Sequence, residues 1–209
     1  VGGVTTSGYY VITDNNGVYI CLRQGTNASG VAIASTVKPT GSNNDPFETS
    51  DGYVWKFLYT VSALDATLFM TNDFIPVTRQ AATDSNSTGN EIKQYQIQTA
   101  AKPGMITSFD LTNGGTGYTN PKLAVNDVVQ DSSVIDFTVA GGVIKKIEYH
   151  GDSSTLSYIH GLRGAKLTVT DSNGSNASVR AIMSSGLGIG GDPTSDLKSG
   201  SMMIGVRLD

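Results

Sequence analysis

One short segment constrains the fold more than any other: residues 53–61, which read Tyr-Val-Trp-Lys-Phe-Leu-Tyr-Thr-Val. Aromatic and β-branched residues favour strands, and the side chains of a strand alternate between its two faces. A strand over this segment places Tyr53, Trp55, Phe57 and Tyr59 on one face. Such a face must be covered by another layer of the chain or by a partner. We therefore take these four residues as candidates for the core or for an interface.

The composition indicates a β-rich protein with many turns. The chain has 209 residues, of which 25 are Gly, and only 15% carry charge. Ordinary soluble domains carry about 25% charge, and coiled coils are rich in Ala, Glu, Lys, Leu and Arg. The net charge of −4 is too small for a charged disordered tail, and 38% hydrophobic residues are enough to build a core. Long-helical and disordered classes are thereby excluded.

Turn signals divide the chain into short strands. Residues 9–13 and 18–23 flank Asp14-Asn15-Asn16-Gly17, and an Asn-Gly pair between two such runs predicts a hairpin with a type I′ turn. A second hairpin is expected around the polar residues 171–174. Further strands are expected at 74–77, 94–98, 106–111, 134–139, 143–149 and 202–208, and short helices at 62–70 and 192–200. The predicted class is all-β, mainly antiparallel β-sandwich layers with one or two short helices.

The organisation along the chain suggests three parts. Residues 1–82 form a β domain with a long polar loop at 24–50, and the polar stretch 79–90 is the best linker candidate. Residues 91–183 form an inserted β-sandwich region. Residues 184–209 provide a C-terminal strand, which we expect to return to the first domain.

The inserted region contains a weak two-unit repeat. Residues 104–111 align with 142–149, and each copy leads through a polar loop to Lys-Leu-x-Val, at 122–125 and at 166–169. The alternative is a chance similarity between strands bounded by Gly.

The candidate chemical motifs point away from catalysis. Gly186, Gly188 and Gly191 match G-x-G-x-x-G, but the mechanism of that motif needs a βαβ unit, for which the remaining chain is too short. His150 and His160 are the only histidines, and neither has zinc-ligand spacing or a G-x-S-x-G partner. We expect no catalytic residues and no cofactor.

Metal binding and disulfide bonding are not expected either. The oxygen-rich stretches 14–17 and 171–176 lack the ligand spacing of an EF-hand, and turn chemistry explains both. Cys21 is the only cysteine, so no disulfide forms within the chain, and its apolar neighbours predict a buried side chain.

Charge and hydropathy also limit the partners. A net charge of −4 and an isoelectric point near 5.0 argue against nucleic-acid binding, which uses clustered Lys and Arg. No apolar run reaches the length of a transmembrane helix, so we expect no membrane contact.

Several segments resemble one family. Residues 51–59 resemble a signature stretch of the small β-rich baseplate wedge protein of T-even-type contractile-tailed phages. Val18-Tyr19-Ile20-Cys21-Leu22 stands where that family has a V-Y-x-C-L strand, and a polar excursion separates the two segments here as in the family. Residues 72–77 resemble its N-x-x-I-x-V-P strand with the Pro shifted, and residues 186–208 resemble the tail of relatives from marine phages.

The resemblance implies a structural role rather than an enzymatic one. It implies a β-sandwich subunit that dimerises within the baseplate wedge, contacts other wedge proteins, and resides in the tail of the virion after assembly in the host cytoplasm. Two alternatives remain open at this point. One is a carbohydrate- or receptor-binding tail module that uses the aromatic residues of 53–59 as an exposed sugar platform. The other is a hydrolase with His150 or His160 as its base.

Overall fold

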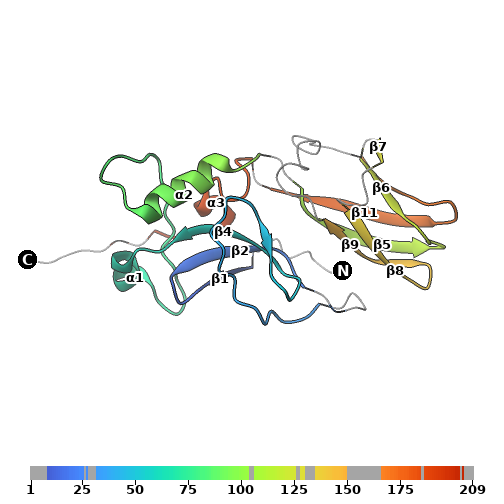
Figure 1. Cartoon of the computed structure of the whole chain (residues 1–209), viewed down its shortest axis with the longest axis horizontal. Helices are drawn as coiled ribbons and strands as arrows, with labels where there is room; N and C mark the ends of the chain where they lie inside the picture. The colour runs from blue at the N-terminus through green and yellow to red at the C-terminus, as the bar shows by residue number, and fades with distance from the viewer. Residues whose placement is uncertain are drawn as a thin grey trace, which may run out of the picture. The chain divides into compact units, whose positions relative to one another are not determined.

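A computed structural model describes residues 9–25, 27, 32–103, 106–125, 128–129, 135–149, 166–184, 186–202 and 204 (Figure 1). The fold is mostly β, with 35% strand and 15% helix, and consists of several antiparallel sheets and a few short helices. This confirms the predicted class.

The chain divides into two compact units. Unit 1 comprises residues 1–21, 37–102 and 187–209, and unit 2 comprises residues 22–36 and 103–186. The C-terminal segment therefore clusters with the N-terminal β structure. The change from unit 1 to unit 2 falls after residue 102, whereas the sequence suggested a linker at 79–90.

Unit 1 is built on a four-stranded antiparallel sheet with the order β1-β2-β4-β3. Its strands are β1 (Tyr10–Ile12), β2 (Gly17–Arg23, whose last two residues count with unit 2), β3 (Phe47–Glu48) and β4 (Val54–Thr60). In the ladders, Val11 is opposite Tyr19, and Phe47 is opposite Trp55. Aromatic and apolar side chains therefore meet across neighbouring strands.

The turn between β1 and β2 differs from the predicted two-residue type I′ turn. Asn16 has the left-handed φ of 60°, while Gly17 is already the first residue of β2. The amide of Thr13 donates to the carbonyl oxygen of Gly17 at 2.9 Å. The loop thus has three residues and ends in a left-handed Asn, which is the next most common hairpin solution.

Helix α2 (Gly89–Ala100) corrects the strand predicted at 94–98. Thr88 and Glu91 form a capping box: the Thr88 hydroxyl accepts from the amide of Glu91, and the Glu91 carboxylate accepts from the amide of Thr88. Gln94 and Ile97, three residues apart, are the buried residues of the helix. Their spacing fits a helix face, and the polar–apolar alternation of five residues was a coincidence.

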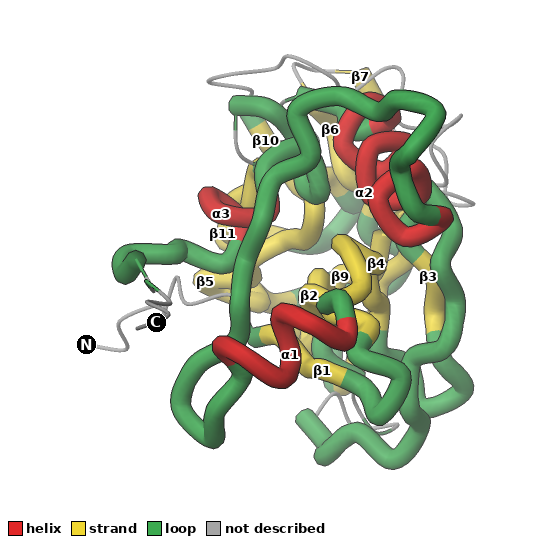
Figure 2. The backbone as a smooth tube through the Cα atoms, turned by 90° about the vertical axis from the view of Figure 1, so that its left-hand side faces the viewer, coloured by secondary structure: helices red, strands yellow, loops and turns green. Residues whose placement is uncertain are grey.

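Two shorter helices also belong to the part of unit 1 that the structure describes. Helix α1 (Ala63–Phe69) is capped by Ser62, whose hydroxyl accepts from the amide of Asp65, and helix α3 (Pro193–Asp196) begins after Asp192. Both confirm the predicted helix starts. Between α1 and α2 the chain runs as a long loop (Figure 2). Residues 74–77 belong to this loop and form no strand ladder, contrary to the prediction.

The described residues of unit 2 form three antiparallel sheets, β10-β6-β7, β11-β5 and β8-β9. Their strands are β5 (Ile106–Thr116), β6 (Lys122–Val125), β7 (Val128–Val129), β8 (Ile135–Ala140), β9 (Val143–Tyr149), β10 (Leu167–Thr170) and β11 (Ser175–Met183). The sheets share one core, whose buried residues are Tyr118, Leu123, Val125, Ile135, Ile144 and Ile147.

The repeated Lys-Leu-x-Val segments of unit 2 pair with each other. They form β6 and β10, in which Leu123 is opposite Val169 and Val125 is opposite Leu167. The two copies thus meet as an antiparallel pair, and both apolar residues of each copy are opposite apolar residues of the other. The strand predicted at 202–208 has described residues only at 202 and 204, and these are not in a strand.

Candidate interaction surface

The four aromatic candidates, which are Tyr53 and three residues of β4, are buried in unit 1. Tyr53, Trp55, Phe57 and Tyr59 are between 1% and 4% exposed. The rings of Tyr53 and Trp55 stack, with centroids 5.6 Å apart and planes inclined by 13°. A sugar platform needs exposed ring faces, which these residues do not offer.

Further contacts fix the same aromatic cluster. Tyr19 packs edge-on against Phe57, with ring centroids 5.4 Å apart. The Tyr59 hydroxyl donates to the carbonyl oxygen of Pro76 at 2.9 Å, and burial raises the pKa of this phenol well above its ordinary value. These contacts hold the loop at Pro76 against β4.

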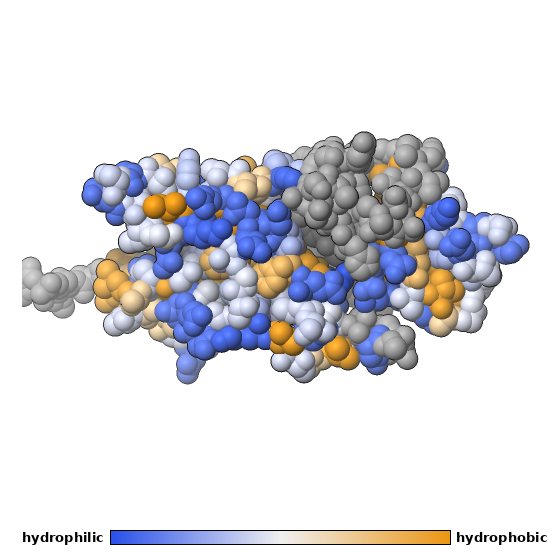
Figure 3. All heavy atoms as spheres, viewed as in Figure 1, coloured by the Kyte–Doolittle hydropathy of each residue, from blue (hydrophilic) through white to orange (hydrophobic). Residues whose placement is uncertain are grey.

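The exposed large hydrophobic residues all belong to unit 1, as far as the structure describes the chain. They are Tyr9, Tyr10, Leu64, Leu68, Met70, Phe74, Ile92, Leu187, Met202 and Ile204. The space-filling view shows several such hydrophobic areas among polar ones on one face (Figure 3). Hydrophobic residues scattered singly are normal on a surface, so the question is which of these lie together.

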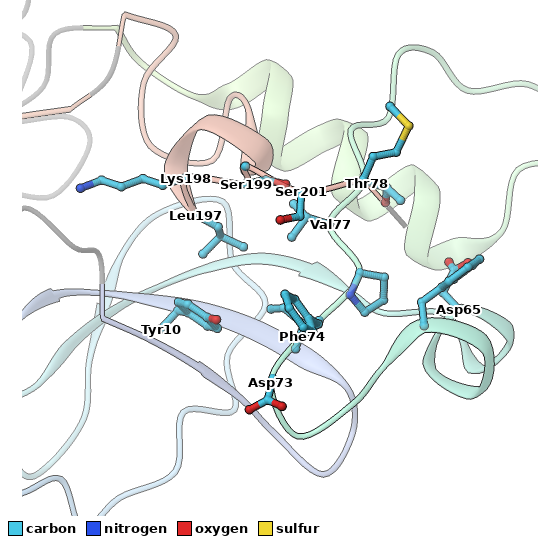
Figure 4. Close-up of a pocket in the computed structure, with 15 residues that line it drawn as sticks. Tyr10, Asp65, Asp73, Phe74, Val77, Thr78, Leu197, Lys198, Ser199 and Ser201 are labelled. Carbon is cyan, nitrogen blue, oxygen red and sulfur yellow. The ribbon is translucent and has the colours of Figure 1, made fainter. Parts of the chain in front are cut away.

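A groove of about 490 Å³ gathers several of them. It is lined by Tyr10 of β1, Asp65 and Phe69 of α1, the loop 73–78 and the segment 197–202. Tyr10, Phe74 and Leu197 are drawn together around its opening in Figure 4. We call this site the unit 1 groove. Its lining is apolar in the middle, as the fully buried centre of a protein interface is.

Helix α1 extends the apolar surface beyond the groove. None of its residues is buried, and Leu64 and Leu68 are 68% and 61% exposed. They are four residues apart and so lie on the same face of the helix. From the sequence, this spacing is a signal for a face that packs on the core, and only the structure shows that the face points outward.

Charged side chains line the groove as well. Asp65 and Asp73 are acidic lining residues, and Lys198 is a basic one, whose side chain extends outward in Figure 4. Figure 4 draws Asp65 and Lys198 at opposite ends of the groove, with Asp73 at its rim. The Ser62 hydroxyl donates to the Asp65 carboxylate at 2.8 Å. The groove therefore has an acidic end and a basic end.

The motifs considered for chemistry are occupied by structural contacts where the structure describes them. In the glycine-rich segment, the amide of Gly190 donates to the Asp196 carboxylate at 2.6 Å, and the following helix has four residues. At 171–176, the Asp171 carboxylate accepts from main-chain amides of its own turn and of the neighbouring loop. Both segments use their polar groups to shape loops.

The remaining candidate residues form no catalytic or metal-binding group in the part of the chain that the structure describes. Cys21 forms no disulfide and is partly exposed, so it is less buried than predicted. His150 and His160 lie outside the described residues. Within the described ranges, no group of three or more His, Cys, Asp or Glu side chains is placed to hold a metal ion. None of the helices formed by the described residues is long and apolar enough to cross a membrane.

Lys56 is a buried charged residue outside the groove, and the sequence reasoning did not single it out. It points from the middle of β4 and is 4% exposed. Desolvation lowers the pKa of its ammonium group to about 8, although Asp45 and Asp196 nearby favour the charged form. A lysine within an aromatic strand is the signal that would have found it.

Comparison with protein-family models, with curated proteins and with solved structures found no match for the chain.

Proposed function

We propose that this protein is a structural subunit of a contractile phage tail, placed in the baseplate wedge and assembled through protein–protein contacts of unit 1. The observation that supports an assembly role is the apolar surface formed by the unit 1 groove and the outer face of α1. The baseplate assignment rests on the resemblance of residues 18–22, 51–59 and 72–77 to the wedge family.

The energetic argument concerns Leu64 and Leu68. Removing apolar surface from water contributes about 25 cal/mol per Å², so two leucines covered by a partner contribute on the order of a few kcal/mol. In the isolated chain both side chains remain in water. The state in which a partner covers the apolar face of α1 is therefore more stable than the state in which this face lies in water.

The partners in this proposal are other wedge proteins and a second copy of the chain. A two-fold dimer uses the same patch on both subunits, and an apolar helix face such as Leu64–Leu68 is self-complementary in that sense. The low fraction of charged residues, 15%, agrees with surfaces that become interface cores, where charge is depleted.

The proposal is tested by two measurements. The first is mass spectrometry of purified virions of a phage that carries this chain, which should find it among the tail proteins. The second is light scattering of the purified chain alone and mixed with wedge proteins of the same phage. A strictly monomeric chain that binds none of them and is absent from virions would overturn the proposal.

Matched variants locate the interface. The double substitution Leu64→Ser and Leu68→Ser should weaken dimerisation or wedge binding, because both side chains are exposed and α1 buries no residue of its own. Leu187→Ser is the control, since Leu187 is also an exposed leucine of unit 1 but lies outside the groove and α1. Equal effects of both changes would place the interface elsewhere.

A further inference from the structure

We propose that the unit 1 groove binds an extended segment of a partner protein, with an apolar centre, a basic residue beside Asp73 at the rim and an acidic group at the Lys198 end. This inference rests on the proposed function, because it names the chemistry of the partner for the same surface.

The first argument comes from the loop that lines the groove. Pro76 restricts Ile75 to extended conformations, and the Pro76 carbonyl oxygen accepts from the buried Tyr59 hydroxyl. In the described part of the chain, the main-chain N–H and C=O groups of Ile75 and Val77 have no hydrogen-bond partner. Both residues line the groove.

These main-chain groups suit an added strand. In an extended backbone, successive carbonyl groups point to opposite sides. The Pro76 carbonyl group points to Tyr59, so the carbonyl groups of Ile75 and Val77 both point to the other side. A partner segment in an extended conformation can satisfy them by pairing alongside, as peptides do at exposed strand edges. Unpaired main-chain groups of this kind are not satisfied by an apolar small molecule or a lipid chain.

The second argument comes from charge. Asp73 has no hydrogen bond or ion pair to its carboxylate among the described residues, and the same holds for the ammonium group of Lys198. Asp73 at the rim of the groove and Lys198 at one end thus carry unneutralised charges of opposite sign. Electrostatic complementarity favours a segment with a cation at one end and an anion at the other, and selects against like charges.

The test uses short fluorescein-labelled peptides with the centre Val-Phe-Leu-Ile, measured by fluorescence anisotropy on the full chain. Their end residues are Lys and Glu, Lys at both ends, or Glu at both ends. The peptide with mixed ends should bind tightest, with each mismatched end weakening binding by about two- to fivefold, the range of exposed ion pairs. High salt should reduce this preference.

Variants of the groove should change the preference in a defined direction. Asp73→Lys should favour the peptide with Glu at both ends, and Lys198→Glu should favour the peptide with Lys at both ends. Lys122→Glu is the control, because Lys122 is an exposed lysine of unit 2. A mixed peptide N-methylated on alternate residues should bind about three- to tenfold more weakly, since it loses main-chain donors.

Three outcomes would overturn the inference. The first is equal binding of all peptides, and the second is a preference that the groove variants leave unchanged. The third is binding only to a chain that ends at Met202, which would assign the groove to residues 203–209 of the same chain. The inference and the proposed function can fail separately. If the groove shows the peptide preference but the chain is absent from virions, the groove assignment stands and the proposed function fails. If the chain is present in virions but shows no peptide preference, only the groove assignment fails.

Discussion

The ammonium group of Lys56 donates a hydrogen bond to the main-chain oxygen of Asn44. Lys93 of α2 donates to the side-chain oxygen of the same asparagine at 3.2 Å. Asn44, in the polar loop 24–50, is therefore bonded both to β4 of the sheet and to α2, the helix that packs on β4. The Lys56 ammonium group that makes this bond is almost completely removed from water. Its burial makes the stability of the chain depend on pH.

The first prediction concerns the pH dependence of folding. The pKa of Lys56 is about 8 in the folded chain against 10.5 ordinarily, so between these values the unfolded chain binds more protons. The free energy of unfolding should rise as pH increases through this window, by at most about 3 kcal/mol. Above about pH 10 the trend should reverse, because the raised pKa of Tyr59 favours ionisation of the unfolded chain.

The change Lys56→Met tests this directly. It should remove the rise between about pH 8 and about pH 10 and stabilise the chain at pH 7 by about 1–2 kcal/mol, since the lost hydrogen bond offsets part of the relieved desolvation. Urea unfolding followed by circular dichroism measures both effects. Lys93→Met is the control, because it removes the other lysine on Asn44 and leaves Lys56 in place. A rise with pH that persists in the Lys56→Met variant would contradict the assignment.

The second prediction concerns Trp55. Its side chain is buried against Tyr53, and its indole Nε1 has no hydrogen-bond partner among the described residues. Trp55→Ala should lower the free energy of unfolding by about 3–5 kcal/mol. Trp55→Phe should cost clearly less, because it keeps a ring in the stack and removes a buried donor that makes no bond. Equal losses for the two variants in urea unfolding would contradict this account.

The sequence could predict elements whose local pattern is unambiguous. The aromatic alternation of residues 53–61 indicated β4, and Asp192 before Pro193 indicated the start of α3. Residues 94–98 misled because five residues do not distinguish a period of two from a period of 3.6, and the capping box at Thr88 was the stronger signal. Extended sequences such as 74–77 become strands only when a neighbour pairs with them.

The candidate surface was harder to predict than the core. Leu64 and Leu68 carry the same local signal whether their helix face packs inward or outward, and tertiary contacts decide between the two. Lys56 likewise occupies a strand position that a solvated lysine could occupy, and its burial follows from α2 and the loop at Asn44. Such properties depend on segments far apart in the sequence.

The third prediction compares two glycines. A Cβ atom at Gly114 of β5 would lie 2.2 Å from the carbonyl oxygen of Ile144 in β9, so Gly114→Ala should force the strands apart and lower stability by about 1–3 kcal/mol or more. Gly89 begins α2 and has nothing within 4 Å of such an atom. Gly89→Ala should raise stability by about 0.4–1 kcal/mol.

Hydrogen exchange measures each glycine variant in its own unit. Faster exchange of core amides in unit 2 is expected for Gly114→Ala, and slower exchange of α2 amides for Gly89→Ala. Unchanged exchange of the β5 and β9 amides in Gly114→Ala would contradict the close approach of these strands.

The last prediction concerns the acid side of the pH range. The Asp171 carboxylate accepts from the amides of Asn173, Thr119 and Asn120 at 3.0, 2.9 and 2.6 Å, and these bonds lower its pKa to about 2. Because the folded pKa lies below the ordinary 3.8, the stabilisation is present above that value and is lost as pH falls toward 2. The loop at 119–120 should therefore separate from the 171–174 turn in strong acid.

Amide chemical shifts measured by NMR follow this opening. The signals of Thr119, Asn120 and Asn173 should titrate together with a midpoint near pH 2, and Asp171→Asn should shift them at neutral pH. Asp136→Asn is the matched control, because Asp136 is an exposed aspartate of unit 2 whose carboxylate, among the described residues, accepts from the amide of its neighbour Phe137 alone. Three separate midpoints, or signals that Asp171→Asn leaves unmoved, would show that Asp171 does not join the two loops.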